Sequence, residues 1–491
     1  MAIGWKCVRL AASTHAYLLQ GAWKASWNKN HLPRSPRKTD YHPERRYDGT
    51  GAFGETLIVV FKQAFSTDVH GSVCLMILLF CGKVAYSARQ GWIYEALLVD
   101  AMHSKSIFES GSVHALGLLS LNWQHFELSF IGGVSTSVTY GLPVQRRDDP
   151  VVRYTEKALL DGNNVAAPGK YLVNIIPQLK YVPEWMPGAH FKKVAREVRE
   201  ELDELMNRPY KESLNSIVSP MCSDSKEMKP QQFLQNAGTA RESFVSTTLE
   251  RYRDKPDFDL QALYTKQTAV QVFAAASETS GAAITTFILA MLTHPDVQRL
   301  TQKEIDSVVG RDSLPDFWIL SISHTSQLLS RSWHPIVPAG VPHLTSDEDV
   351  YEGYYIPKNC IITPNTYAML HDEDVFPDPE EFRPSRFLRS DGTIRDDLPD
   401  PENIASFGFG RRICPGREIA LSMLHITAVS ILHLFDIRPA LDDNGHPINV
   451  KPKFFAASLI SNPVPFRCKI TPRGGIDVES LLQEYSGTDP M

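Results

Sequence analysis

The chain has 491 residues, of which 43% are hydrophobic and 22% charged, so it is long and apolar enough to bury a large core. Its formal net charge of −6 argues against nucleic acid as a partner. The seven cysteines are odd in number and show no framework spacing, which fits a reducing compartment and not a disulfide-stapled secreted protein.

Residues 1–130 are the least informative part of the chain, because they show weak periodicity and no strong motif. The first forty residues carry several lysines and arginines, and the best apolar run nearby, residues 73–81, is nine residues long. A membrane-spanning helix needs about 20 apolar residues. We therefore expect an atypical N-terminal region over 1–130 without an anchor, a main domain over 131–475 and a C-terminal tail over 476–491.

Two segments of the main domain have helical periodicity. Apolar residues recur at helical spacing between Phe191 and Met206, and Pro209 is expected to end that helix. Residues 267–293 are apolar on almost every side, which is typical of a central core helix or of a membrane span. A polar group in the middle of this segment favours the core.

Shorter elements complete the predicted fold. His294 and Pro295 indicate the start of a further helix. Residues 350–364 show the alternation and the Gly and Pro punctuation typical of short strands. Residues 421–435 are apolar around most of a helical circumference, which predicts a buried helix. The predicted fold class is mainly α with a small β region.

A cysteine-centred motif carries the strongest chemical signal. It opens at Phe407 and reads Phe-Gly-Phe-Gly-Arg-Arg-Ile-Cys-Pro-Gly over residues 407–416. A thiolate that ligates haem iron needs a backbone that can approach the porphyrin closely and a cation for a haem propionate. It also needs a helix start behind it, because the positive helix end favours thiolate over thiol.

Residues of the motif match these needs. Gly410 and Gly416 permit close approach and unusual dihedrals, and Arg412 supplies the positive charge. Pro415 fits the first position of a helix whose positive end would point at Cys414. The alternative is a buried structural cysteine beside a glycine turn. The agreement of six positions of the motif favours haem-thiolate ligation.

The motif and the sequence from about Gly132 to Arg473 resemble the cytochrome P450 family, of the fungal microsomal type. The likeness is closest to fungal secondary-metabolite hydroxylases of the O-methylsterigmatocystin oxidoreductase kind. The resemblance implies the cytochrome P450 fold, heme b (iron protoporphyrin IX) as the cofactor, and residues 131–475 as the haem domain. It implies that Cys414 is the iron ligand and that four further residues bind the cofactor: Phe407, Gly410, Arg412 and Gly416.

The resemblance also assigns residues outside the cysteine motif. His343 would meet a haem propionate, or it is an ordinary polar residue at a strand start. Glu278 and Thr279 match the acid-Thr pair of the family, with Ala276 where glycine is usual. They would deliver protons to dioxygen; in the alternative, Glu278 pairs with a basic neighbour and Thr279 bonds back within its helix. We favour the proton relay, because Cys414 follows downstream.

The activity that the resemblance implies is monooxygenation of an apolar small molecule, a fungal secondary metabolite, with one oxygen atom from dioxygen. The chain shows no flavin or nicotinamide motif, so electrons would come from a separate NADPH-dependent cytochrome P450 reductase. The family location is the cytosolic face of the endoplasmic reticulum membrane, with a cytoplasmic location as the alternative for a chain without an anchor. Two other interpretations are a thiolate-haem enzyme that rearranges oxygenated substrates, and a protein without haem.

One cluster departs from the family pattern. The arginine matching Arg386 pairs in relatives with a Glu-x-x-Arg pair just before Trp333, and breaking such a buried ion network costs about 3–5 kcal/mol. Residues 318–332 contain no Glu, and five serines in fifteen residues are a poor helix composition. Either the gene model is faulty, with Ser-Ile-Ser-His-Thr-Ser a shifted reading of Leu-Tyr-Leu-Pro-Tyr-Ile, or the chain is a catalytically impaired remnant. We favour the first hypothesis, which would also account for residues 1–130.

Sequencing the transcript tests the frameshift hypothesis. We expect a message that encodes a family-like segment with a Glu-x-x-Arg pair in place of residues 318–332. An in-frame message that encodes residues 318–332 as written would refute the hypothesis and leave the impaired protein.

Overall fold

The computed structural model describes residues 131–143, 149–166, 171–174, 176–217, 241–315, 333–390, 393–395, 397–455, 459–478 and 480–481. These residues form two compact units. Unit 1 comprises the described residues of 333–383 and 395–414, and unit 2 comprises those of 131–315, 384–394 and 415–481. The segments 1–130 and 318–332, on which several predictions fall, lie outside the described residues.

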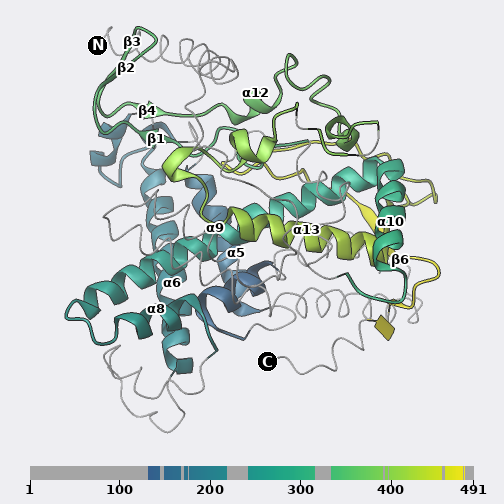
Figure 1. Cartoon of the computed structure of the whole chain (residues 1–491). Helices are drawn as coiled ribbons and strands as arrows, with labels where there is room; N and C mark the ends of the chain where they lie inside the picture. Colours follow the sequence, from purple (N-terminus) through teal and green to yellow (C-terminus); the bar gives the residue numbers. More distant parts are fainter. Residues whose placement is uncertain are drawn as a thin grey trace, which may run out of the picture. The chain divides into compact units, whose positions relative to one another are not determined.

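Unit 2 is built mainly from helices (Figure 1). The long ones are α5 (Pro150–Ala166), α6 (His190–Ile217), α8 (Phe244–Tyr252), α9 (Phe258–Thr293), α10 (Pro295–Val309) and α13 (Arg417–Leu434). Residues 131–140 are also helical, and three short 3-10 helices are η1 (Leu172–Asn174), η2 (Pro177–Tyr181) and η6 (Pro384–Phe387). One antiparallel pair joins strands β5 (Phe435–Pro439) and β6 (Cys468–Pro472). The mainly α class with a small β part is confirmed.

Helix α9 is the apolar centre of unit 2. It begins at Phe258, earlier than the predicted residue 267, and its 36 residues make it about 54 Å long. It contacts α5, α6, α8, α10, α13 and β5, and Figure 1 shows α13 running beside it. Both α9 and α13 are long and apolar enough to cross a membrane by length and composition, and 56% of each apolar stretch is buried inside the structure. This burial agrees with the expected core helix.

The N-terminal half of α9 lies in an aromatic core. Tyr140, Phe244, Phe258 and Phe273 are each at most 1% exposed, and they come from three separate helical segments, residues 131–140, α8 and α9. The ring of Tyr140 meets Phe273 edge to face with 5.6 Å between the ring centroids. Burying a side chain of this size stabilises the fold by about 1.5–3 kcal/mol, so this cluster fixes how the segments around α9 pack.

The predicted end of α6 at Pro209 is wrong, because the helix continues to Ile217. Proline removes one intrahelical hydrogen bond and costs about 3 kcal/mol in a helix interior. The turn that follows Pro209 is held by tertiary contacts. The Tyr210 hydroxyl donates to the carbonyl of Ala262 at 3.3 Å, and Ser213 Oγ donates to the carbonyl of Tyr140 at 2.6 Å. These buried contacts offset the lost bond.

Unit 1 holds two short antiparallel strand pairs, which confirms the strands expected over 350–364. Strand β1 (His343–Leu344) pairs with β4 (Ile361–Ile362), and β2 (Asp349–Tyr351) pairs with β3 (Tyr354–Ile356). The two-residue loop Glu352–Gly353 between β2 and β3 has φ of 47° and 83°. Positive φ at both loop residues is the type I′ turn, whose twist matches a hairpin. Unit 1 also contains the short helices α12 (Thr366–Leu370), η7 (Glu402–Ser406) and η8 (Gly410–Arg412).

A glycine fixes the turn that precedes β1. Gly340 has φ of +58°, and a Cβ built on it would lie 2.3 Å from Cγ of Pro364. The nearby carbonyl of Pro338 accepts a hydrogen bond from the Tyr367 N–H at 2.9 Å. Both the backbone conformation and the close approach therefore require glycine at this position.

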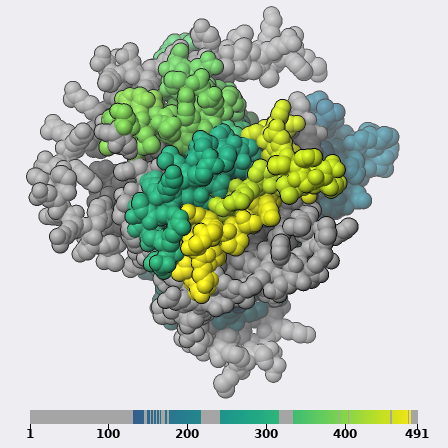
Figure 2. All heavy atoms as spheres, turned by 90° about the vertical axis from the view of Figure 1, so that its right-hand side faces the viewer, coloured from purple at the N-terminus to yellow at the C-terminus, as the bar shows by residue number. Residues whose placement is uncertain are grey.

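Two glutamines of α10 extend the β5–β6 pair. Gln298 donates through Nε2 to the carbonyl of Ile437 at 2.9 Å and accepts from the Ile437 N–H through Oε1 at 2.8 Å. Gln302 donates to the carbonyl of Phe435 at 3.1 Å. The free edge of β5 is thus hydrogen-bonded by side-chain amides, in the way that a neighbouring strand would bond it. Figure 2 shows this face, with the teal atoms of the α10 region beside the yellow C-terminal segment.

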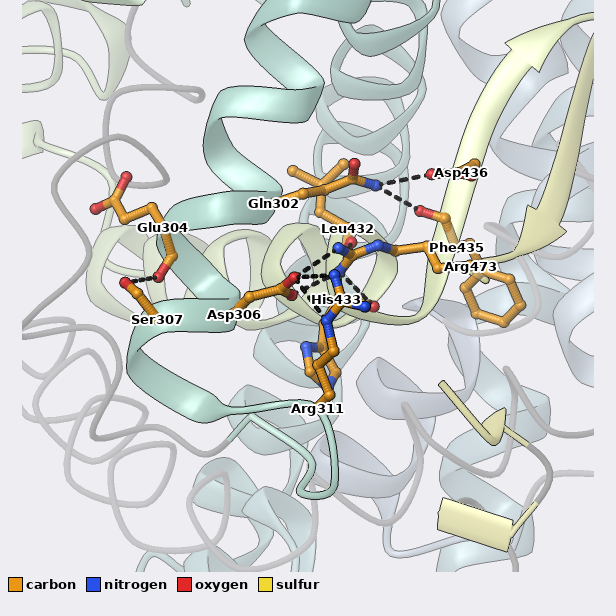
Figure 3. A network of polar contacts seen from close by, with 10 residues as sticks. All are labelled: Gln302, Glu304, Asp306, Ser307, Arg311, Leu432, His433, Phe435, Asp436 and Arg473. Atoms are coloured by element: carbon orange, nitrogen blue, oxygen red, sulfur yellow. Dashed lines mark hydrogen bonds and ion pairs between the residues drawn. The ribbon is translucent and has the colours of Figure 1, made fainter. Parts of the chain in front are cut away.

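An arginine joins α10 to the end of α13 (Figure 3). Arg473 forms two hydrogen bonds of 2.9 Å to the Asp306 carboxylate and donates to the carbonyl of His433, at the end of α13, at 2.9 Å. Burial favours a higher pKa for Asp306, but hydrogen bonds from Arg473 and Arg311 outweigh it and hold the pKa below its usual value. The carboxylate therefore stays charged, and Arg473 also satisfies a carbonyl that a helix end leaves open.

Replacing Gln298 by alanine tests the role of the glutamine edge. Gln298→Ala leaves the Ile437 N–H and carbonyl buried without their partner, so we expect a loss of about 2 kcal/mol or more. The urea midpoint of the full chain should fall accordingly. The control is Gln271→Ala, the same change at an exposed position of α9, which should shift stability by under about 0.5 kcal/mol. Equal midpoints for the two variants would contradict the prediction.

Candidate functional site

The cysteine motif folds into a loop that closes on itself within unit 1. Helix η7 ends at Ser406, and the N–H of Cys414 donates to the carbonyl of Phe407 at 2.8 Å. Between them, Gly408 and Gly410 have φ of +79° and +55°. Residues with a side chain rarely adopt this left-handed conformation, so the two glycines allow the chain to turn back. The expected unusual dihedral at Gly410 is confirmed.

The end of this loop is exposed and has a mixed chemical character. The side chains of Cys414, Arg411 and Arg412 are exposed, and Phe409 and Ile413 are each 37% exposed. Exposed aromatic and branched apolar side chains beside a cysteine and two guanidinium groups form a chemically specific surface. A soft sulfur ligand, apolar contacts for a ring and cations for carboxylates are the groups that an iron porphyrin requires. The residues present therefore fit the haem expected from the sequence.

Two details of the motif differ from the prediction. Helix α13 begins at Arg417 with Gly416 as its N-cap, so Pro415 precedes the helix and does not occupy its first position. Gly416 has φ of −87°, an ordinary value, so it does not use the unusual dihedrals that glycine permits. The cause is the turn formed by Pro415 and Gly416, which delays the helix start by two residues. Any need for glycine at 416 must come from close approach and not from conformation.

The acid-Thr pair lies in the middle of α9, in unit 2. Glu278 and Thr279 are half-buried, whereas their neighbours Ser277 and Ser280 are buried in the core. Thr279 Oγ1 donates to the carbonyl of Ala275 at 2.7 Å. This is the back-bonded geometry that the sequence left open as an alternative. The hydroxyl oxygen can still accept a hydrogen bond from a further donor.

The remaining candidates lie on other elements. His343 is exposed on β1 of unit 1. Arg386 is half-buried in η6 of unit 2, and its expected Glu-x-x-Arg partner falls on residues outside those described. The structure thus brings Phe407, Gly410, Arg412 and Cys414 together in one loop, while Gly416, Glu278 and Thr279 belong to unit 2.

An aromatic cluster that the sequence did not predict supports unit 1. Glu380 accepts hydrogen bonds from the Tyr367 hydroxyl at 2.7 Å and, through its main-chain carbonyl, from Trp333 Nε1 at 3.1 Å. Tyr367 stacks on His371 with 3.9 Å between the rings. Tyr367 lies in α12, which contacts η7, the helix that leads into the cysteine loop. The only sequence signal was the Pro-rich segment around Glu380, which by itself does not identify these partners.

Burial sets the ionisation of this cluster. It lowers the pKa of His334 to about 4, with the nearby His371 acting in the same direction. It raises the pKa of Tyr367 to about 12, together with the hydrogen bond to Glu380. At neutral pH the cluster therefore holds a neutral imidazole at His334 and a protonated phenol at Tyr367, which suits a structural role beside η7.

Comparison with known proteins identifies the family. The family model for cytochrome P450 matches residues 126–469. This match covers most of the chain and includes both the acid-Thr pair and the cysteine loop. The chain therefore belongs to the cytochrome P450 family.

Named relatives come from fungi. The chain is 37% identical over 358 residues to a cytochrome P450 monooxygenase of Armillaria gallica, covering 72% of this chain and 66% of the relative. It is 37% identical over 343 residues to cytochrome P450 monooxygenase 98 of Postia placenta, covering 68% and 62%. It is 33% identical over 369 residues to tryptamine 4-monooxygenase of Psilocybe cyanescens, covering 74% and 68%. The match thus spans just under two thirds of the length of the first two relatives.

Proposed function

We propose that the chain is a haem-thiolate monooxygenase that inserts one oxygen atom of dioxygen into an apolar small molecule. The observation that carries this proposal is the self-closed loop of residues 407–414, which presents the exposed Cys414 between apolar and basic side chains. Membership of the cytochrome P450 family and relatives named as monooxygenases support it. The resemblance to fungal secondary-metabolite hydroxylases makes a secondary metabolite the proposed substrate.

The residues of the loop have separate roles in holding heme b. Cys414 would ligate the iron, and electron donation from its thiolate favours cleavage of the O–O bond when haem is bound. Arg412 would pair with a propionate. Phe407 and Gly410 would contact the macrocycle, and His343 is proposed as a second propionate contact. Phe409 and Ile413, which the sequence did not single out, add apolar area at the exposed end of the loop.

Glu278 and Thr279 are the proposed proton relay. Oxygen activation consumes two protons, and a hydroxyl beside a carboxylate can pass them on. The hydrogen bond from Thr279 to Ala275 holds the hydroxyl in one rotamer, with its lone pairs directed away from the helix carbonyl. Passing a proton through Thr279 would require its O–H bond to rotate away from the Ala275 carbonyl. The small side chains of Ala275 and Ala276 leave room on this part of the helix.

Partners and location follow from the family. We propose that electrons come from a separate NADPH-dependent cytochrome P450 reductase, since the sequence carries no flavin or nicotinamide motif. We propose the cytosolic face of the endoplasmic reticulum membrane as the site of action, with a cytoplasmic location as the alternative. A substrate with an apolar body fits the mainly apolar residues 337–342 beside His343.

The second candidate is an impaired cytochrome P450 remnant. It is favoured by the absence of Glu from residues 318–332. Retention of haem by the chain as written separates the two proposals.

A carbon monoxide difference spectrum of the reduced chain tests haem ligation. We expect the strongly red-shifted Soret band of thiolate-ligated haem, and we expect Cys414→Ser to abolish it because a serine hydroxyl gives no thiolate. The matched control is Cys360→Ser, a half-buried thiol of unit 1 outside the loop, which should keep the band. Absence of the band from the unmodified chain would favour the impaired remnant.

A threonine substitution tests the relay. With a substrate found by screening, Thr279→Ala should lower product formed per NADPH consumed by at least about tenfold, since positioned proton transfer contributes about 10²–10⁴-fold. The lost product should appear as hydrogen peroxide. The control is Thr293→Ala, which removes an equivalent hydroxyl that bonds back to Leu289 on the same helix. Unchanged coupling in the Thr279 variant would remove it from the mechanism.

A further inference from the structure

A cavity of about 380 Å³ opens between α5, η1 and α6 in unit 2. Its volume falls in the range of small-molecule sites, about 300–1,000 Å³. One part of its wall is apolar and is formed by Val165, Val194, Val198 and the ring of Tyr171. Val198 is buried and the other three are half-buried, so these side chains form a wall that can contact the body of a ligand.

The rest of the wall is charged and mainly acidic. Asp161, Glu197 and Glu201 place three carboxylates in the wall, where the ammonium group of Lys157 is the lining cation; outside the wall, Lys193 Nζ lies 3.7 Å from Glu197 Oε1. Lys157 Nζ pairs with Glu201 Oε1 and lies 3.3 Å from Asp161 Oδ2. These two hydrogen bonds raise the pKa of Lys157, so it stays protonated. Three carboxylates against the ammonium groups of Lys157 and Lys193 leave the cavity with a small excess of negative charge.

One carboxylate oxygen in this wall lacks a partner. Glu201 Oε2 is buried and has no hydrogen-bond partner among the described residues, although Oε1 is paired with Lys157. The Glu201 side chain as a whole is 20% exposed. A buried acceptor without a donor is costly, by about 1–3 kcal/mol and more for a charged group. A ligand that brings an N–H donor with a positive charge would satisfy this oxygen and reduce the excess negative charge together.

We propose that this cavity binds an organic ammonium ion with an apolar body. The ammonium group donates to Glu201 Oε2, and the body lies against Tyr171 and the valines. Lys157 competes with the ligand, because it holds two of the carboxylates through the same kind of interaction. An anionic ligand would have to approach three carboxylates balanced by two ammonium groups, which the charge balance opposes. The site does not depend on haem, so it is independent of the proposed monooxygenase activity.

The test measures binding of 2-phenylethylammonium to the full chain by isothermal titration calorimetry. The comparator is 3-phenylpropionate, which has a similar body and the opposite charge. We expect the ammonium probe to bind and Glu201→Gln to weaken it by at least about tenfold, since charge-assisted hydrogen bonds are about twice as strong as neutral ones. The control is Glu200→Gln, which removes the same charge from the adjacent exposed position of α6 and should bind the probe like the unmodified chain.

A second variant changes the affinity in the opposite direction. Lys157→Met removes the competing ammonium group and should tighten binding of 2-phenylethylammonium several-fold, whereas an anion site would be lost. Circular dichroism of each variant checks that the fold is retained, and the Lys157 variant carries the test if the Glu201 variant does not fold.

Three outcomes would overturn the proposal. They are no binding of the ammonium probe, equal or tighter binding of 3-phenylpropionate, and an affinity that neither Glu201→Gln nor Lys157→Met changes. Binding of the amine to haem iron falls under the third outcome, and a shift of the Soret band would reveal it.

Discussion

Helix α9 is apolar around most of its circumference, and its burial shapes unit 2. A mainly apolar helix must be covered over much of its surface; five helices and strand β5 contact α9, and an exposed stripe remains at Leu263, Gln267 and Gln271. Its hydroxyl-bearing residues are compatible with this burial because they bond back to the helix. Thr265, Ser277 and Thr285 each donate to the carbonyl four residues earlier. The acid-Thr pair is therefore carried by an element that surrounding segments hold in place, as the proposed proton relay would require.

The need to hydrogen-bond buried backbone groups also explains the side-chain contacts at the edges of the core. Among the described residues strand β5 pairs with β6 alone, so its other edge needs donors and acceptors from elsewhere. Gln298 supplies both to Ile437 with a single side chain. Arg473 donates a hydrogen bond to the His433 carbonyl at the end of α13, and the Asp306 carboxylate balances the charge of Arg473. Side chains thus complete the hydrogen bonding where regular secondary structure stops.

The sequence predicted those features that depend on neighbours along the chain. The apolar core helix, the short strands over 350–364 and the positive φ of Gly410 all follow from local pattern and glycine chemistry. The sequence did not predict features that depend on contacts between residues far apart in the chain. Pro209 does not end α6, because Tyr210 and Ser213 bond to other segments. The roles of Gln298 and Glu380 were also invisible, since their partners lie far away in the sequence or are backbone groups.

The ion pair between Asp306 and Arg473 joins residues 167 positions apart. During synthesis at about 5–20 residues per second, Asp306 emerges roughly 8–33 s before its partner. Until then the edge of β5 that pairs with β6 and the end of α13 lack the groups that satisfy them, and Asp306 has Arg311 but not Arg473 as a partner. Residues 468–473 therefore act as the closing segment of unit 2, and the nascent chain stays open at this face for most of its time on the ribosome. A mutation in residues 468–473 would therefore impair folding first, seen as chaperone dependence and aggregation. Loss of activity would follow from that folding defect.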